Sequence, residues 1–502
     1  MFIGVDVGTT NCKAAVLNDK GQFLGYSSKE YSINYTKSGY AEQDAKHVWD
    51  TTKLVIREAI DKSGIIDVKA LSISVQGDAI IPVNKRIEPL HPTILGMDYR
   101  GWPQIQKCIE LFGKKEIFKI TGMPPHPLNS LPKILWIKDN HPDLFNKTWK
   151  FMTYADFILS KLGAEPVIDY TMASRTMAFS LFDRNWSQKI LNGTGIPIEK
   201  LSKPISSGKV VGKMPSKLAS DLGLKKCIHL ISGCHDQTAA ALGAGVIREG
   251  IAVDSSGSAE VISTAFPEPL INNKMLNAYY PCYIHSKSDQ FFTFALIHSG
   301  GVVYQWFRDQ FCDSEKKIAI EQGIDTYELI EKHISSQPSN LFVFPHFIGS
   351  GTPTCDLDSK GTIMGLTMDT TKYDIARAIL EGLAYEIQLN LEVMREAGIK
   401  IESLIAVGGG TKSKKFLKIK ANITGLTLRT LNVRDTACLG AGILAAVGTK
   451  FYKNIPEAVK ICVRFDKTYE PDSSLINHYK ERYKIYRNLY YSLLKLYNSM
   501  NK

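Results

Sequence analysis

The sequence predicts an α/β protein made of two similar halves. Apolar runs that end in polar or glycine-rich turns alternate with stretches of helical apolar spacing along most of the chain. The opening run "FIGVDVG", the two apolar segments after it and a turn at residues 18–21 predict a meander of three strands. Near residue 230 a similar order begins again. Together these observations predict the fold class.

The first half continues with one clear helix and two strands that end in polar residues. Residues 44–63 carry apolar side chains such as Val48 and Ile60 at helical spacing. Residues 68–78, "VKALSISVQGD", predict a buried strand. Residues 227–245 predict a strand, a turn and a helix of small residues. Strands and helices therefore alternate up to the middle of the chain.

The second half opens on a segment that is similar to the start of the chain. In "GIAVDSSGSAEVISTAF", Asp254 stands where Asp6 stands in the first strand, and Gly257 follows it as Gly8 follows Asp6. Short matches of this kind also occur between unrelated β-hairpins. If the repeat is real, the two halves face each other and bring two glycine-rich turns to one cleft.

The rest of the second half predicts two helices around a strand, followed by a stripe of large side chains. Residues 371–398 have helical apolar spacing, a capping pattern at their start and a glycine at their end. The strand 403–410 and the helix 411–425 follow. At 479–497, tyrosines and leucines recur every three or four residues. We interpret this stripe as a contact with the core rather than with a second subunit.

The composition argues against several classes of protein. With 502 residues the chain is too long for one core, and its 44% hydrophobic and 22% charged residues are ordinary for a globular protein. We find no apolar run of the roughly 18 residues that span a membrane and no signal peptide, which favours the cytosol. The net charge of +11 comes from scattered lysines, which favours a solvated surface over a nucleic-acid site. The nine cysteines stand singly, which favours free thiols.

Three small-residue turns follow apolar strands, at residues 8–10, 255–258 and 408–411. Turns of this kind present backbone N–H groups without crowding side chains, and a phosphate needs such donors. The chain has no G-x-x-x-x-G-K-[ST] loop and none of the protein-kinase motifs. The three turns together predict phosphate binding of another kind.

Two longer motifs carry a resemblance to a known family. The segment "GTIMGLTMDTTKYDIARAILE", residues 361–381, fits that family's C-terminal signature. The segment "SLPKILWIKD", residues 130–139, fits its N-terminal signature, except that Leu128 stands where a small or aromatic residue is usual. The segments "DVGTTNCK", "GCHDQTAAALGAG" and "VGGGTKSKKFLKIKANITG" occur in the expected order. Over nearly its whole length the chain resembles the FGGY carbohydrate kinases.

The resemblance implies two actin-like ATPase domains, of the RNase H-like or hexokinase-like kind, around a central cleft. The N-terminal domain, residues 1–247, would contain the sugar site, the first phosphate turn and the catalytic aspartate. The C-terminal domain, residues 248–502, would contain the second phosphate turn and the adenosine pocket. The implied reaction transfers a phosphoryl group from ATP, with Mg²⁺, to a hydroxyl of a small sugar or polyol.

The resemblance also implies roles for single residues. Asp236 is the expected catalytic base, and the start of a helix is a favourable place for it because it stabilises a negative charge. Asp236 is also expected to contact the substrate and the metal. Asp6 is the expected Mg²⁺ ligand, through water, beside the phosphates. The residues expected to bind the nucleotide belong to the three turns or lie near them: Gly8, Thr9, Thr10, Lys13, Gly257, Ser258, Gly409, Gly410 and Lys414.

The sugar site is expected at polar residues in the N-terminal half. The candidates are Gln76, Gly77, Asp78, Asp98 and Arg100, with Ser174 and Arg175 as weaker ones. Polar groups at strand ends suit a ligand with many hydroxyls. Asp98 and Arg100 can also simply pair with each other, and that alternative stays open.

The chain is most similar in pattern to the family's xylulokinases, so a ketopentose such as xylulose is the expected substrate. Gly77-Asp78 replaces the Met-His pair that is usual there, and glycerol kinases usually have Arg-Glu. Ribulose, erythritol or erythrulose, fuculose, gluconate and glycerol therefore stay open, as does a homodimer. A sugar-sensing regulator or an actin-like nucleotide-binding protein is disfavoured. Asp236 is present, and the first strand begins at Phe2, which leaves no room for an added helix-turn-helix.

Overall fold

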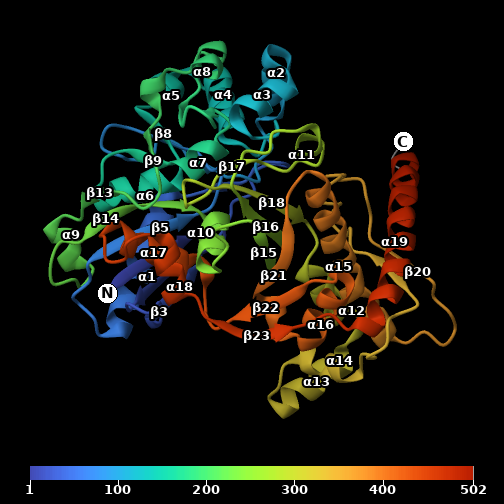
Figure 1. The fold of residues 1–502 in the computed structure, drawn as a ribbon. Helices are drawn as coiled ribbons and strands as arrows, with labels where there is room; N and C mark the ends of the chain where they lie inside the picture. Colours follow the sequence, from blue (N-terminus) through green and yellow to red (C-terminus); the bar gives the residue numbers. More distant parts are fainter. Residues whose placement is uncertain (501–502) are drawn as a thin grey trace.

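Each half of the chain builds one mixed β-sheet, and the two sheets form the centres of two lobes (Figure 1). The computed structural model describes residues 1–500. The sheet of the first lobe has six strands in the order β13-β14-β5-β1-β2-β3. Their bounds are Phe2–Val7 for β1, Asn11–Leu17 for β2, Phe23–Glu30 for β3, Ala70–Val75 for β5, Val210–Lys213 for β13 and His229–His235 for β14.

The sheet of the second lobe has seven strands in the order β17-β18-β16-β15-β21-β22-β23. Their bounds are Gly250–Ser256 for β15, Glu260–Phe266 for β16, Tyr283–Ile284 for β17, Phe291–Ile297 for β18, Ile401–Gly408 for β21, Thr427–Leu431 for β22 and Phe465–Tyr469 for β23. Short strands pair outside the two sheets: β4 (Glu42–Gln43) with β7 (Thr93–Ile94), β6 (Ile81–Val83) with β8 (Lys150–Met152), β9 (Val167–Asp169) with β12 (Lys203–Ile205), β10 (Phe179–Ser180) with β11 (Asn185–Trp186), and β19 (Phe342–Phe344) with β20 (Thr362–Met364).

The two sheets repeat one topology. In each, three strands form an antiparallel meander, β1-β2-β3 in the first lobe and β15-β16-β18 in the second. A parallel strand lies beside the first strand of each meander, β5 beside β1 and β21 beside β15, and β14 and β22 continue the two sheets in parallel. The predicted α/β class and internal repeat are therefore confirmed. Asp6 and Asp254 lie in the corresponding strands β1 and β15.

The predicted helices at 44–63, 371–398 and 411–425 correspond to α1, α15 and α16, although α16 begins three residues later than predicted, at Lys414. The bounds of these and further helices are Ala45–Ser63 for α1, Asp236–Gly243 for α10, Gly301–Phe311 for α12, Asp313–Gln322 for α13, Thr326–His333 for α14, Lys372–Glu396 for α15 and Lys414–Thr424 for α16. The side chain of Asp44 caps α1 by accepting hydrogen bonds from two of its N–H groups. Thr371 and Asp374 form the predicted capping box of α15.

Two helices from the second half of the chain pack on the first lobe. α17 (Thr436–Gly448) and α18 (Ile455–Cys462) follow β22, yet they share a hydrophobic cluster with Phe2 of β1 and Leu17 of β2. Figure 1 shows α17 beside α10 and β5 of the first lobe, and β23 then returns to the second sheet. The predicted division between residues 247 and 248 follows chain order, and the packing departs from it in these two helices.

Glycines allow α17 to approach its neighbours until the backbones touch. A Cβ atom added at Gly4 of β1 would lie 2.0 Å from the carbonyl oxygen of Cys438 in α17. Added at Gly243 of α10 it would lie 1.9 Å from Thr436 O, and at Gly440 of α17 it would lie 2.0 Å from Ala239 O. Since no side chain fits in these gaps, the three glycines are required for the contact.

The remaining helices extend the first lobe or cap the second. α2, α4, α5 and α8 form the top of the first lobe in Figure 1. The bounds of the remaining helices are Trp102–Phe112 for α2, Lys114–Thr121 for α3, Ser130–Asn140 for α4, Pro142–Lys147 for α5, Tyr154–Leu162 for α6, Tyr170–Arg175 for α7, Gln188–Thr194 for α8, Ser216–Asp221 for α9, Asn273–Asn277 for α11 and Ser473–Met500 for α19. Short 3₁₀ turns occupy Ile198–Lys200 and Gly409–Lys412.

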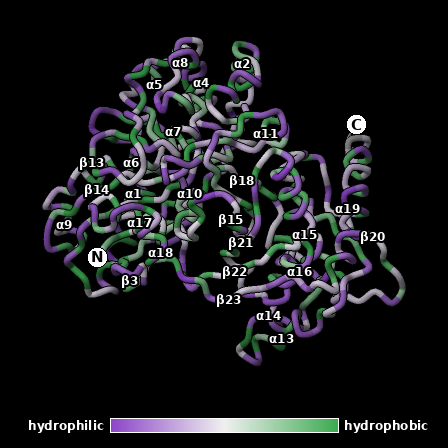
Figure 2. Tube along the Cα trace, viewed as in Figure 1, coloured by the Kyte–Doolittle hydropathy of each residue, from purple (hydrophilic) through white to green (hydrophobic). Residues whose placement is uncertain are grey.

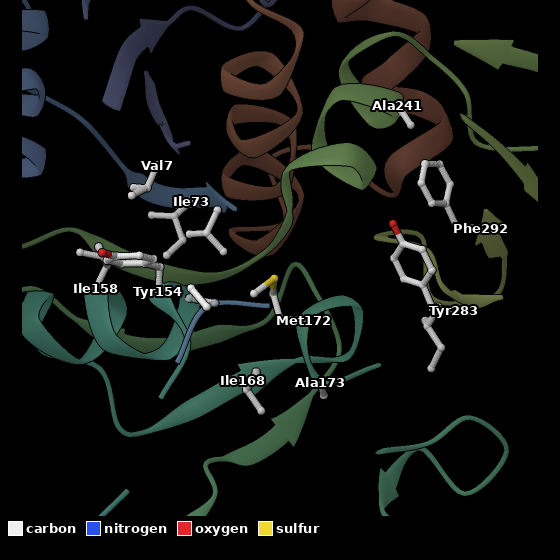
Figure 3. Close-up of a cluster of buried hydrophobic side chains, with 14 of the residues drawn as sticks. Val7, Ile73, Tyr154, Ile158, Ile168, Met172, Ala173, Ala241, Tyr283 and Phe292 are labelled. Carbon is white, nitrogen blue, oxygen red and sulfur yellow. The ribbon is translucent and has the colours of Figure 1, made fainter. Parts of the chain in front are cut away.

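Buried apolar side chains join the two lobes beside the cleft. Figure 3 shows Val7, Met172, Ala173 and Ala241 of the first lobe in one cluster with Tyr283 and Phe292 of the second. α7 packs against β17 in this region. The two lobes therefore share a continuous core on one side.

The C-terminal tyrosine stripe packs into the second lobe. In Figure 2, α19 alternates between hydrophilic and hydrophobic colours, as a helix with one buried face does. Tyr479, Tyr486 and Tyr490 are buried, and the Tyr486 ring stacks on Phe344 and Tyr385. The interpretation of this stripe as a core contact is confirmed.

The prediction of free thiols is confirmed. All nine cysteines are free, and all but Cys227 and Cys355 are buried. Among residues 1–500, no helix combines the length and the apolar character that crossing a membrane requires.

Substitution of Gly440 tests the close contact between α10 and α17. We expect Gly440→Ala to lower the free energy of unfolding by about 2 kcal/mol, because the clash with the Ala239 carbonyl outweighs the gain in helix propensity. The measurement is thermal and urea unfolding of the purified protein.

Gly442→Ala, on the same helix, is the matched control. Its added Cβ would lie 2.6 Å from Leu17 Cδ1, the end of a flexible side chain that can move away. We expect a clearly smaller loss of stability. Equal losses for the two variants would contradict the backbone-contact account.

Candidate active site

A cleft of about 590 Å³ lies where the two lobes meet. Its first-lobe wall includes Asp6, Lys13 and Asp236. Its second-lobe wall comes from the ends of β15 and β21, with Ser255 and Gly409 among the lining residues. The start of α17 closes one side. The cleft therefore brings together residues from the second and third of the predicted phosphate turns and the predicted catalytic aspartate.

Asp6 lies at the base of this cleft in a charged network. Ser74 Oγ donates to Asp6 Oδ1 at 2.7 Å, and Lys13 Nζ donates to Oδ2 at 3.3 Å. Lys13 Nζ also lies 3.0 Å from Oδ2 of Asp435, a residue that was not among the predicted site residues. Burial, together with the nearby Asp435, raises the pKa of Asp6 above its usual range. Lys13 thus compensates two carboxylates at one point of the cleft.

Asp435 could have been found from a local signal. It caps α17 by accepting a hydrogen bond from Cys438 N at 2.9 Å. Asp followed by Thr and a run of small residues is a recognisable helix start. Its position beside Lys13 depends on the path of α17 across the lobes, which no local pattern reveals.

Asp236 is the first residue of α10 and follows β14 directly. The side chain is 28% exposed, and its Oδ1 atom is buried and has no hydrogen-bond partner among the described residues. His235 Nε2 lies 3.1 Å from this oxygen, and His235 Nδ1 lies 3.0 Å from the Tyr283 hydroxyl. Asp236 is therefore a partly exposed carboxylate on the wall of the cleft, with its Oδ1 atom buried beside His235.

The environment of Asp236 suits acid–base chemistry near neutral pH. Burial, and then the charge of Asp6, raise the pKa of Asp236 to about 7. Burial lowers the pKa of His235 well below its ordinary value, so its imidazole is neutral at pH 7. A carboxylate with a pKa near the working pH is an effective general base.

The first small-residue turn is held by side chains from three other segments. Gly8 O accepts hydrogen bonds from the Tyr31 hydroxyl at 2.5 Å and from Gln76 Nε2 at 3.2 Å. Gln43 Nε2 donates to Thr9 O at 2.5 Å, while Thr10 is exposed. Gln76, predicted as a sugar contact, thus supports the turn in this structure.

The second turn packs against the start of α12. Gly257 O accepts a hydrogen bond from Gly301 N at 2.9 Å, and Ser258 O accepts one from Gly300 N at 2.9 Å. An added Cβ at Gly301 would lie 2.8 Å from Gly257 O. Gly300 and Gly301 were not among the predicted site residues, although two glycines before a helix are a detectable signal.

A second cavity, of about 680 Å³, lies inside the second lobe beside this turn. Gly257, Gly409 and Gly410 line it together with aromatic side chains that include Tyr304 and Phe416. At Gly410 an added Cβ would lie 2.7 Å from Ser256 Oγ, so the close approach of the two turns requires glycine. Its size, its aromatic wall and its glycine turns suit a nucleoside.

Lys414 lines neither the cleft nor this cavity. Its side chain is exposed on the first turn of α16. Lys412 lines both spaces instead. Several lysines lie close together in this segment, and the sequence alone does not distinguish which of them contacts the nucleotide. The 3₁₀ turn of residues 409–412 places Lys412 beside the two spaces.

Asp78 and Arg175 form a buried ion pair close to Asp236. Arg175 Nη2 donates to Asp78 Oδ2 at 2.5 Å, while Asp78 Oδ1 and Arg175 Nε have no hydrogen-bond partner among the described residues. Asp78 has a φ of 67°, a strained conformation for a residue with a side chain. An added Cβ at Gly77 would lie 2.7 Å from His235 Nε2. Gly77 therefore allows the strand end to pack against the residue before Asp236.

Asp98 and Arg100 pair with each other inside the first lobe. Asp98 accepts hydrogen bonds from Arg100 Nε and Nη2 and from Ala41 N, and Arg100 Nη2 also reaches Glu42 at 2.6 Å. The Arg100 guanidinium lies over the Tyr40 ring, 4.1 Å from its centroid. Both side chains are almost fully buried, and neither lines the cavities described here.

A third cavity, of about 210 Å³, adjoins Arg175. His126 and Leu128 of the first lobe and Tyr279 and His298 of the second are among its lining residues. Ser174 points elsewhere, because its hydroxyl donates to Tyr170 O at 2.7 Å. Arg175, one of the weaker candidates for a sugar contact, thus lines a cavity, whereas Asp98 and Arg100 do not.

The described residues contain no ready-made metal site. Within residues 1–500, no three or more His, Cys, Asp or Glu side chains group so as to hold an ion. Asp6 and Asp236 nevertheless line one cleft, and Asp236 Oδ1 is unpartnered. This donor set fits a hard cation that brings further oxygen ligands with it.

Comparisons with known proteins identify the family of the chain. A model of the FGGY family of carbohydrate kinases, N-terminal domain, matches residues 1–243, and the model of the C-terminal domain matches residues 253–449. A xylulose kinase from Bacillus subtilis is 26% identical over 490 residues, 97% of this chain and 96% of that protein. A gluconokinase from Bacillus subtilis is 26% identical over 457 residues, 89% of this chain and 87% of that protein.

A solved structure has the same fold throughout. The ligand-bound xylulose kinase from Lactobacillus acidophilus has a TM-score of 0.89 at 25% identity and covers 99% of both chains. The predicted arrangement of two actin-like domains is thereby confirmed. The chain belongs to the FGGY family of carbohydrate kinases, which are phosphotransferases.

Proposed function

We propose that this protein transfers the γ-phosphoryl group of ATP to a hydroxyl of a small neutral sugar, with Asp236 as the general base. The observation that carries the proposal is the partly exposed carboxylate of Asp236 on the wall of the cleft between the lobes. A ketopentose such as xylulose is the first candidate for the acceptor. The family implies ATP as the donor.

Asp236 takes the proton of the attacking hydroxyl. Its pKa of about 7 leaves a large fraction of the carboxylate ionised at neutral pH, and the proton that it gains has a stable place there. Phosphoryl transfer depends mainly on alignment and charge neutralisation, so one positioned base is sufficient. The neutral imidazole of His235, 3.1 Å away, limits the directions in which the carboxylate can turn.

The donor is proposed to span both lobes. Its nucleoside lies in the second-lobe cavity, against Gly409 and Gly410, and its phosphates lie along the turns at Gly8–Thr10 and Gly257–Ser258. Lys412 lines both spaces and offers a positive charge between them. Lys414 is exposed outside both, so we assign it no contact with the nucleotide.

Mg²⁺ is part of the proposal. Asp6 and Asp236 would hold the ion, together with phosphate oxygens and water. When bound, Mg²⁺ neutralises charge on the phosphates during transfer. Burial and Asp435 raise the pKa of Asp6, and Lys13 opposes this rise because its ammonium lies 3.3 Å from the carboxylate.

The acceptor is proposed to bind at Asp78 and Arg175. The free Oδ1 of Asp78 accepts a hydrogen bond, and the free Nε of Arg175 donates one. A hydroxyl group can do both at once, whereas a carboxylate only accepts. The charges of the pair also balance, which favours a neutral ketose or polyol over an aldonate such as gluconate.

Relatives support this choice without deciding it. The names of the similar proteins include a xylulose kinase and a gluconokinase at the same identity. Glycerol, tetritols and other ketoses remain alternatives within the same mechanism. A protein that binds sugar and nucleotide without transfer is disfavoured, because it has no need of a base in the cleft. A cytosolic enzyme is consistent with nine free cysteines.

Replacement of the base tests the reaction. We expect Asp236→Asn to lower kcat by at least about a thousandfold, because the amide cannot accept the hydroxyl proton. The measurement is ATP-dependent ADP release against pentuloses, hexuloses, tetritols, glycerol and gluconate. As the control, calorimetry measures the binding of ADP and of sugar to the variant, and we expect this binding to persist.

The outcome that would contradict this proposal is specific. If the variant phosphorylated the preferred sugar at a rate close to that of the parent, Asp236 would not be the base. If no sugar in the panel gave turnover by the parent, transfer to this class of acceptor would be refuted.

Replacement of the acceptor-binding carboxylate tests the sugar site. We expect Asp78→Asn to lower kcat/KM for the sugar by about a hundredfold or more and to leave KM for ATP unchanged. The variant loses a charged acceptor and leaves Arg175 without its counter-charge. The measurement is steady-state kinetics with each substrate varied.

Asp98→Asn is the matched control, since Asp98 is also a buried aspartate paired with an arginine. We expect it to lower the melting temperature and to leave the sugar KM unchanged. A rise in sugar KM for Asp98→Asn but not for Asp78→Asn would instead favour the original prediction of Asp98 as a substrate contact.

A further inference from the structure

A fully buried lysine lies behind the second phosphate turn. Lys420 Nζ, on α16, donates to Asp254 Oδ2 at 2.6 Å, Ser256 Oγ at 2.7 Å and Glu260 Oε1 at 2.5 Å. None of these side chains is more than 4% exposed. A buried ammonium is costly unless all its protons are bonded, and here three acceptors satisfy all three.

This network uses the second-lobe counterpart of Asp6. Asp254 lies in β15, which corresponds to β1, but its carboxylate turns to Lys420 and lines none of the cavities described here. The repeat has therefore diverged, since Asp6 faces the cleft and Asp254 is used inside the lobe. Lys420 balances one of the two buried carboxylates.

Two carboxylate oxygens of the network, Asp254 Oδ1 and Glu260 Oε2, have no hydrogen-bond partner among the described residues, and of these two residues only Glu260 lines a cavity. Glu260 Oε1 bonds Lys420 and Ser256, whereas Glu260 Oε2 is buried and has no hydrogen-bond partner among the described residues. Glu260 lines the second-lobe cavity. A buried, unpartnered carboxylate oxygen at a cavity is an acceptor in need of a donor.

The position of Glu260 indicates which part of a nucleotide would meet it. Lys420 contacts Ser256 of the phosphate turn and also lies 4.2 Å from the centroid of the Phe416 ring, on the aromatic wall. Glu260 is thus near the place where the phosphate turn and the aromatic wall come together. In a nucleotide the ribose joins the phosphates to the base, and its hydroxyls can donate.

We propose that Glu260 Oε2 accepts a hydrogen bond from a ribose hydroxyl of the bound nucleotide, and that Lys420 is the positioning residue that orients Glu260. The inference rests on the proposed nucleotide cavity and adds a specificity residue to it. Burial raises the pKa of Glu260, but the ammonium of Lys420 outweighs this effect and holds that pKa below its ordinary value. Glu260 therefore stays ionised, which strengthens the hydrogen bond.

Deoxynucleotides test this contact directly. Calorimetry would give the Kd of ADP, 2′-deoxy-ADP and 3′-deoxy-ADP for the parent protein and for Glu260→Ala. We expect the parent to bind ADP about tenfold to a hundredfold more tightly than at least one deoxy analogue, as a hydrogen bond to a charged group allows. In Glu260→Ala we expect this ratio to fall close to one. The variant keeps Lys420 paired with Asp254, which favours folding.

Asp254→Asn separates recognition from a structural role. Asp254 shares Lys420 with Glu260 but does not line the cavity. We expect this variant to lose thermal stability and to keep the parent's preference for ADP over the deoxy analogue. A purely structural role of the network would lower affinity for all three nucleotides equally in both variants.

Three results would overturn the inference. The first is equal binding of ADP and both deoxy analogues by the parent. The second is an unchanged preference in Glu260→Ala. The third is no binding of ADP by the parent at all, and this one alone would also refute the proposed nucleotide cavity.

Discussion

The contact between the backbones of α10 and α17 is the constraint on which the cleft depends. Gly243 and Gly440 let the two helices touch, and Gly4 lets α17 touch β1. α10 begins with Asp236, and α17 begins beside Asp435. A wider separation of these helices would move the carboxylates of the cleft relative to one another. The protein therefore needs glycines at positions where no ligand binds.

The same contact joins the lobes. The chain passes from the first sheet to the second between α10 and β15, returns before α17 and leaves again after α18. All three connections are short, so they constrain how the lobes move about the α10–α17 pair. In kinases of two domains, closure of the cleft around both substrates excludes water from the reaction. The helix pair would be the stable base of such a movement.

The two halves share a topology, but different kinds of side chain line the cavities of each lobe. Asp6 faces the cleft, while Asp254 in the matching strand is paired with Lys420 inside the second lobe. The glycines of the second lobe line a cavity with an aromatic wall, which suits a nucleoside. The first lobe instead provides carboxylates and the Asp78–Arg175 pair, which suit a metal, a proton and hydroxyl groups. Under the proposed function, one lobe would bind the phosphoryl donor and the other the acceptor.

Local patterns in the sequence predicted the features that depend on neighbouring residues. The first meander, the capped helix α15 and the position of Asp236 between a strand and a helix are of this kind. Features that depend on contacts distant in sequence were not predictable in this way. The path of α17 onto the first lobe and the pairing of Lys420 with Asp254 are examples. Asp98 and Arg100 show the same limit, because their spacing permits a ligand site and an internal pair equally well.

The most direct test of the account is a crystal structure with a non-hydrolysable ATP analogue and the preferred sugar. The account predicts an acceptor hydroxyl within hydrogen-bond distance, about 2.6–3.2 Å, of an Asp236 carboxylate oxygen. It predicts the γ-phosphate on the other side of that hydroxyl and the nucleoside in the second-lobe cavity. A sugar bound away from Asp236, or a nucleoside outside that cavity, would contradict it.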